Sequence, residues 1–147
     1  MPNILLGDND HGCREFIAFV LRQANYHVYE ASNGAQVVQI VRDEPIDLVM
    51  LEVRLPMLTG YEAARMIGRE SPTTPVMFVS ARGLRSEVEK AFDCAPLVVD
   101  YLIKPVLAAQ LVRRVDSVLR VSRTYGIDVV RQESLARPDL AYVRLRP

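Results

Sequence analysis

The sequence predicts an α/β fold built on an open, parallel, doubly wound sheet with helices on both faces. Short apolar runs bounded by turn residues alternate five times with longer stretches of helical period. Three of these runs are apolar on both faces, which is typical of parallel strands covered by helices on either side. Right-handed connections would then wind the five βα units into one sheet.

The individual elements follow from these two kinds of segment. Strands are expected at residues 3–7, 26–30, 46–51, 75–80 and 98–103, where Val, Ile, Leu and Tyr concentrate. A helix is expected after each strand, because apolar residues there recur at helical intervals. The residues that define these helices are Cys13, Ile17, Val20 and Leu21; Val37, Val38 and Val41; Tyr61, Ala64, Met66 and Ile67; Leu84, Val88, Ala91 and Phe92; and Leu107, Leu111, Val115, Val118 and Leu119.

Composition excludes several classes of protein. Half of the 147 residues are apolar, which is enough for one sizeable core. Eighteen basic residues balance eighteen acidic ones, so no net charge points to nucleic acid or to a membrane surface. No apolar run approaches the roughly 18 residues of a membrane span, and the first residues lack a secretory pattern. We therefore expect a cytoplasmic protein, with Cys13 and Cys94 as packing residues.

Polar side chains gather where the expected strands end. Asp8 and Asn9 follow the first strand, Glu52 the third and Lys104 the fifth, while Ser80 closes the fourth. In parallel sheets, function collects at the carboxyl ends of the strands. Such a set of oxygens, hydroxyl and amine can bind a divalent cation and a phosphoryl group.

Four segments of the chain carry a specific resemblance. In order, they are ILLGDND, DLVMLEVRLPMLTG, PVMFVSAR and DYLIKP. Together they resemble the receiver domain of bacterial two-component response regulators, over residues 1–123. The resemblance implies a flavodoxin-like (βα)5 sheet of order 2-1-3-4-5, and it leaves residues 124–147 as a C-terminal extension or the start of a linker or output region.

The same resemblance assigns roles to individual residues. The family's acidic pair falls on Asp8 and Asn9, and its phosphorylated aspartate falls on Glu52. Its switch hydroxyl and aromatic fall on Ser80 and Tyr101. The family's lysine falls on Lys104, and the peptide bond to Pro105 is expected to be cis.

Two of these positions depart from the family pattern. An amide at Asn9 has no net charge to attract a hard dication, so Mg²⁺ binding through Asp8, Asn9 and Glu52 should be absent or weak. The glutamate moves its carboxylate outward by roughly 1.5 Å. We therefore expect a non-enzymatic, phosphorylation-independent signalling module in which Glu52 is a partial phosphate mimic and Lys104 its partner.

Other readings remain open at this point. Glu52 can be the result of inert drift, that is, of sequence change in a domain that no longer signals through this site. The chain can also be a working receiver that accepts phosphate. A flavodoxin-like cofactor protein or small α/β enzyme is the third alternative, although GDND is not a phosphate-binding turn and no nucleophile–base pair is evident.

The last expectations concern partners. An exposed patch of Leu97, Val98 and Val99, with a cross-subunit pair between Asp100 and Arg114, would favour a homodimer through the fourth helix, fifth strand and fifth helix. The alternative is that these residues pack under the chain's own helix. In the extension, short strands are expected at 127–130 and 141–145. No helix-turn-helix fits there, so we expect no direct DNA binding by this chain and unidentified protein partners. The extension can lead into an output domain beyond residue 147, act as a tether or fold back on the receiver.

Overall fold

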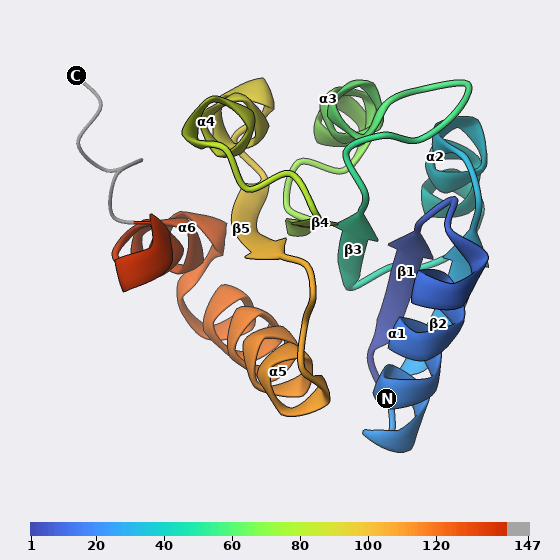
Figure 1. The fold of residues 1–147 in the computed structure, drawn as a ribbon, viewed down its shortest axis with the longest axis horizontal. Coiled ribbons are helices and arrows are strands. Elements are labelled where there is room, and N and C mark those ends of the chain that lie inside the picture. The colour runs from blue at the N-terminus through green and yellow to red at the C-terminus, as the bar shows by residue number, and fades with distance from the viewer. Residues whose placement is uncertain (141–147) are drawn as a thin grey trace.

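The computed structural model describes residues 1–140, which form a five-stranded parallel sheet and six α-helices (Figure 1). The strand order is β2-β1-β3-β4-β5, as the resemblance implies. The strands are β1 (Asn3–Gly7), β2 (His27–Ala31), β3 (Leu48–Leu51), β4 (Val76–Ser80) and β5 (Val98–Ile103). The helices are α1 (His11–Gln23), α2 (Gly34–Asp43), α3 (Gly60–Glu70), α4 (Arg85–Cys94), α5 (Ala108–Tyr125) and α6 (Ile127–Leu135), and a 3-10 turn (Pro138–Leu140) follows.

Two apolar cores lie on opposite faces of the sheet. Alternate residues of each strand point to opposite faces, so Val49 joins the core under α2, α3 and α4, while Met50 joins the core under α1 and α5. Both side chains are fully buried. The same division of the helices is visible in Figure 1. The prediction of strands buried on both faces is confirmed.

Side chains in the loops after β1 and β3 cap the helices that follow these loops. Asp10 accepts a hydrogen bond from the main-chain N–H of Cys13 (2.9 Å), which caps the N-terminus of α1. Thr59 and Glu62 form a reciprocal capping box at the start of α3. These caps fix the two loops that follow β1 and β3.

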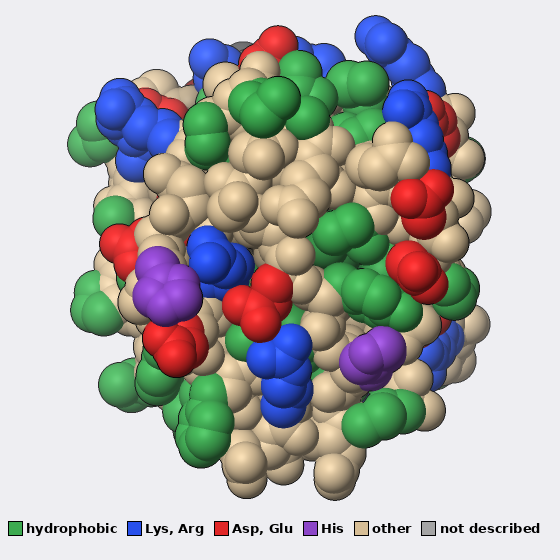
Figure 2. All heavy atoms as spheres, turned by 90° about the vertical axis from the view of Figure 1, so that its right-hand side faces the viewer, with side chains coloured by type: hydrophobic (Ala, Val, Ile, Leu, Met, Phe, Trp, Pro, Cys, Tyr) green, Lys and Arg blue, Asp and Glu red, His purple; other side chains and the backbone are tan. Residues whose placement is uncertain are grey.

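The outer surface mixes charges of both signs. On the face drawn in Figure 2, the blue and red side chains are interspersed, in agreement with the equal numbers of basic and acidic residues. Among residues 1–140, no helix is both long and apolar enough to cross a membrane.

The C-terminal segment differs from its prediction. Residues 127–130 are the first turn of α6 and not a strand, and the strand expected at 141–145 lies outside the described residues. Helix α5 ends at Tyr125, and the next residue, Gly126, has a φ of 93° that favours glycine. Val130 and Ser134 then lie four residues apart and are both buried. Packing on the domain thus overrides the strand preference of the β-branched run.

The exposed patch expected at Leu97, Val98 and Val99 was wrong. These residues and Asp100 are at most 1 % exposed. Val98 and Val99 point into opposite cores of the sheet, and Leu97 packs toward α3. Helix α6 lies beside β5, between α4 and α5 (Figure 1). The reason to expect a homodimer through this face is removed, because the chain's own α6 occupies it.

The pair Asp100–Arg114 also forms within one chain. The Arg114 guanidinium lies 2.8 Å from Asp100 Oδ2, and Arg137, from the segment after α6, lies 2.6 Å from Asp100 Oδ1. Arg131 of α6 donates to the main-chain oxygens of Phe92 (2.7 Å) and Val98 (2.8 Å). Because these cations satisfy buried acceptors, α6 and the turn after it are bound to the domain by polar contacts as well as by apolar packing.

Candidate functional site at the strand ends

Three charged side chains meet where β1, β3 and β5 end. Lys104 Nζ lies 2.9 Å from Asp8 Oδ2 and 2.8 Å from Glu52 Oε2. Parallel register produces this meeting, since the main-chain N–H of Glu52 donates to Gly7 O (2.9 Å) in the neighbouring strand. The expected proximity of Glu52 and Lys104 is confirmed, and the Lys104–Pro105 peptide is cis as expected.

The cluster is largely shielded from water. The side chain of Asp8 is 2 % exposed, and those of Glu52 and Lys104 are 13 % and 15 % exposed. Burial alone would lower the pKa of the Lys104 ammonium. The hydrogen bonds to Asp8 and Glu52 outweigh burial, so the pKa of Lys104 is raised above its ordinary value. The lysine is therefore held in its charged form.

All four carboxylate oxygens of this pair of acids have a donor from the protein. Besides the Lys104 contacts, Asp8 Oδ1 accepts from the main-chain N–H of Asp10 (2.9 Å). Glu52 Oε1 accepts from the main-chain N–H of Val53 (2.8 Å). A cation that enters the site would share these oxygens with the donors already present, because each carboxylate oxygen can accept more than one contact.

The residues that would hold a divalent metal are Asp8, Asn9 and Glu52. Asn9 is exposed and offers a neutral amide oxygen. Across residues 1–140, no group of three or more His, Cys, Asp or Glu side chains is arranged to hold a metal ion. The donor set contains one buried acid and a glutamate already paired with an ammonium, so it is a poor fit to Mg²⁺, which needs near-ideal octahedral oxygen ligation.

Ser80 and Tyr101 lie one loop away and converge on Arg82. Ser80 Oγ accepts from the main-chain N–H of Arg82 (3.2 Å), and the Tyr101 hydroxyl donates to the main-chain oxygen of Arg82. Tyr101 is fully buried, with its ring stacked on Phe78 at 6.1 Å between centroids. The two residues assigned to a switch therefore hold the same backbone segment. Sequence reasoning missed Arg82, because a basic residue just past a strand end is common on surfaces.

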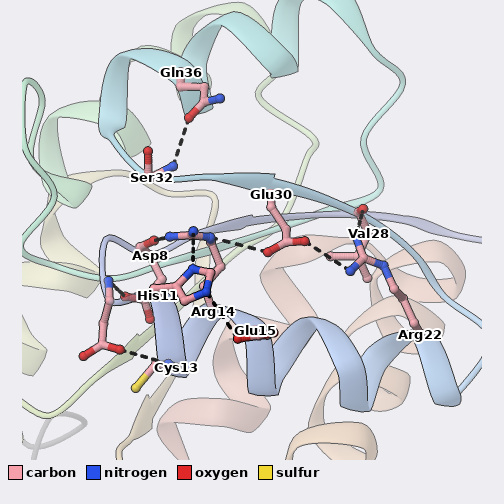
Figure 3. A network of polar contacts seen from close by, with 11 residues as sticks. Asp8, His11, Cys13, Arg14, Glu15, Arg22, Val28, Glu30, Ser32 and Gln36 are labelled. Carbon is pink, nitrogen blue, oxygen red and sulfur yellow. Dashed lines mark hydrogen bonds and ion pairs between the residues drawn. The ribbon is translucent and has the colours of Figure 1, made fainter.

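A second missed residue, Arg14, fixes the loop that carries Asp8. In Figure 3, Arg14 reaches from α1 toward Asp8 on one side and Glu30 on the other. Its Nη1 donates to the main-chain oxygen of Asp8 (2.7 Å), and its Nε lies 3.4 Å from Glu30. His11 lies 3.3 Å from the exposed Glu15, and its Nδ1 lies 3.2 Å from Arg14 Nη2. The spacing of Arg14 on α1 carries no signal of this role.

Two further charged side chains, Asp100 and Arg137, contact the main chain of Tyr101. Asp100 Oδ1 accepts from the main-chain N–H of Tyr101 (2.8 Å), and Arg137 Nη2 donates to the main-chain oxygen of Tyr101 (2.8 Å). Arg137 therefore contacts both Asp100 and the backbone of the aromatic residue. The segment after α6 is in this way attached to the same residue that also contacts Arg82.

Comparison with known proteins agrees with this fold and this arrangement. The family model of the response regulator receiver domain matches residues 4–116. Response regulator RR06 of Streptococcus pneumoniae is 32 % identical over 126 residues, 86 % of this chain and 56 % of the relative. Transcriptional regulatory protein SrrA of Staphylococcus aureus is 27 % identical over 142 residues, 97 % of this chain and 57 % of the relative. The chain thus spans a little over half the length of these relatives.

Among solved structures, a similar one is the receiver domain of sensor histidine kinase PA1611 from Pseudomonas aeruginosa, with a magnesium ion coordinated in its active-site cleft. It superposes with a TM-score of 0.75 at 27 % identity, covering 81 % of this chain and 98 % of that one. Fold, strand-end residues and family model agree, and the chain belongs to the family of response regulator receiver domains, the signal-transduction modules of two-component systems.

Proposed function

We propose that this receiver domain works by protein contact without being phosphorylated, with Glu52 as a permanent, partial substitute for a phosphorylated side chain. The observation that supports the proposal is the 2.8 Å ion pair between Lys104 and Glu52. Lys104, the cation that would compensate the charge of an incoming phosphoryl group, is already paired with the Glu52 carboxylate. The substitute is partial, because a carboxylate has one charge and two oxygens against about two charges and three oxygens.

Two features make Glu52 a poor phosphoacceptor. Both of its oxygens are engaged, by Lys104 and by the Val53 N–H. Phosphoryl transfer also depends on metal ions that neutralise the developing charge and on accurate positioning. The PA1611 receiver holds magnesium in its cleft, but here an amide at Asn9 replaces one acid. We propose that Mg²⁺ binds this chain weakly, so the charge compensation for transfer is reduced.

The test is incubation with acetyl phosphate and Mg²⁺, followed by measurement of intact mass. The wild type should show no stable gain of about 80 Da, the mass of one phosphoryl group. The double variant Asn9→Asp/Glu52→Asp restores the second acid and shortens the acceptor, so it should show the gain. A phosphorylated wild type would instead support the working-receiver alternative, which the magnesium in the PA1611 structure favours.

The partner is expected to be another protein, as for receivers in general. Its identity can be sought with immobilised wild-type protein beside Glu52→Gln, which keeps the shape of residue 52 and removes its charge. A partner that depends on the mimic should be retained by the wild type and reduced on Glu52→Gln. Equal retention on both would support the inert-drift reading of Glu52.

A further inference from the structure

A pocket of about 460 Å³ lies between α3 and α4, next to the loop that follows Glu52. Its lining includes four cationic side chains, Arg54, Arg65, Arg82 and Lys90. Two carboxylates, Glu62 and Glu87, also line it. The formal charge of the lining is therefore positive by two, in a protein with no net charge.

Both carboxylates are already committed to contacts within the protein. Glu62 accepts from the main-chain N–H of Thr59 (3.0 Å) in the capping box of α3. Glu87 pairs with Arg82 (3.0 Å) and accepts from the Tyr61 hydroxyl (3.0 Å). Burial, together with the hydrogen bond to Glu87, raises the pKa of Tyr61, so the phenol stays a donor. Both acids therefore have hydrogen-bond partners within the protein, and the hydrogen bond from Thr59 and, after it, the charge of Arg65 lower the pKa of Glu62.

The remaining cations have no such partner. Within residues 1–140, no ion pair of 4.0 Å or less joins Arg54, Arg65 or Lys90 to a carboxylate. Lys90 instead lies over the ring of Tyr61, with its nitrogen 4.8 Å from the ring centre. Two guanidiniums and one ammonium thus border one concave space with their hydrogen-bond donors unused by acids.

We propose that this pocket binds a small phosphorylated compound with at least two negative charges. Guanidinium groups recognise phosphate oxygens in bidentate geometry, and two of them favour a ligand with more than one charged oxygen group. The volume lies within the range of small-molecule sites, roughly 300–1,000 Å³. An extended polyanion such as nucleic acid would need basic side chains over a longer surface than one pocket.

The pocket is joined to the receiver site through Arg82. The side chain of Arg82 lines the pocket, while its main chain contacts Ser80 and Tyr101. A ligand that draws the Arg82 guanidinium away from Glu87 would act on the segment that these two residues hold. The binding proposal itself does not depend on Glu52 as a phosphate mimic.

The experiment is calorimetric titration of the 147-residue protein with inorganic pyrophosphate in metal-free buffer, at low and at physiological ionic strength. We expect saturable binding that weakens as salt rises. The double variant Arg54→Gln/Arg65→Gln should bind at least about tenfold more weakly. Arg69→Gln, which removes an exposed arginine of the same helix outside the pocket lining, should bind as the wild type does.

Three results of the pyrophosphate titrations would overturn the proposal. They are no pyrophosphate binding at millimolar concentration, equal weakening by Arg69→Gln, and unchanged binding by the double variant. Two further ligands are titrated in the same way: citrate, a polyanion without phosphorus, and adenosine diphosphate. Citrate binding as tight as that of pyrophosphate would refute the preference for phosphate. Tighter binding of the nucleotide would support the proposal and show that the organic part of the ligand contributes.

Discussion

Replacement of Lys104 by methionine should lower the free energy of unfolding by about 2–4 kcal/mol at neutral pH. The ammonium lies within 2.9 Å of one oxygen of Asp8 and one of Glu52, so those two oxygens are roughly 6 Å apart at most. Two unit charges at that distance repel by about 3 kcal/mol at an effective dielectric constant of 20. Removing one partner of a buried pair costs about 3–5 kcal/mol. Glu52 is partly exposed and can turn toward solvent, which reduces the cost.

The measurement is urea unfolding followed by circular dichroism at pH 7.5. Mg²⁺ should stabilise the variant more than the wild type, since a dication can enter where the ammonium was. Lys90→Met, which replaces the other lysine at an exposed position, should change stability by about 1 kcal/mol or less.

The reasoning can be refuted with a second substitution. Glu52→Gln should destabilise the wild type, where it breaks an ion pair, and should be neutral or stabilising in the Lys104→Met background, where it removes a repulsion. The difference between the two effects measures the coupling of the pair. Equal effects of Glu52→Gln in both backgrounds, or a Lys104→Met variant as stable as the wild type, would show that the three charges do not act as a unit.

Three further predictions concern stability. The wild type should lose free energy of unfolding as pH rises above about 10.4, the ordinary lysine value. The pKa of Lys104 is raised in the folded state, so the stability that its charged form contributes is lost as pH rises through the folded pKa. Lys104→Met should lack this loss in alkaline urea titrations. Arg137→Ala should cost about 1–3 kcal/mol, because the fully buried Asp100 loses one of two guanidiniums, whereas Arg123→Ala, at a largely exposed pair, should cost less than about 1 kcal/mol. Thr59→Ala removes the cap of α3 and should cost about 1 kcal/mol in the same assay, with Thr59→Ser close to neutral.

The sheet and the three-charge cluster could be predicted from the sequence because both depend on local patterns. A run such as Leu48–Leu51, apolar on both faces, has few stable environments other than a parallel strand between helices. Once the strands are parallel, residues that follow them lie at one edge, whatever the details of packing. Glu52 and Lys104 are 52 positions apart in the chain, yet topology alone brings them together.

The C-terminal segment could not be predicted in the same way, because its structure depends on what it packs against. Ile127 and Val130 favour a strand by composition, and only the face between α4 and α5 makes a helix the better choice. The error at residues 97–99 has a different cause. Val98 and Val99 are the first residues of β5 and point into the two cores of the sheet, and Leu97 packs toward α3.

The position of α6 changes how the Glu52 site should be connected to the rest of the molecule. Tyr101 has its hydroxyl on the Arg82 loop and its main-chain oxygen on Arg137, and its main-chain N–H donates to Asp100. The loop next to the site and the segment after α6 are therefore bound to opposite ends of one residue. Movement of Tyr101 out of its buried position would have to break the Arg82 contact, while release of α6 would remove the Arg137 contact. Because α6 packs on α5 and β5, a partner that binds the face of α4, β5 and α5 must compete with α6. This holds whether or not the charge of Glu52 favours the active arrangement of Ser80 and Tyr101.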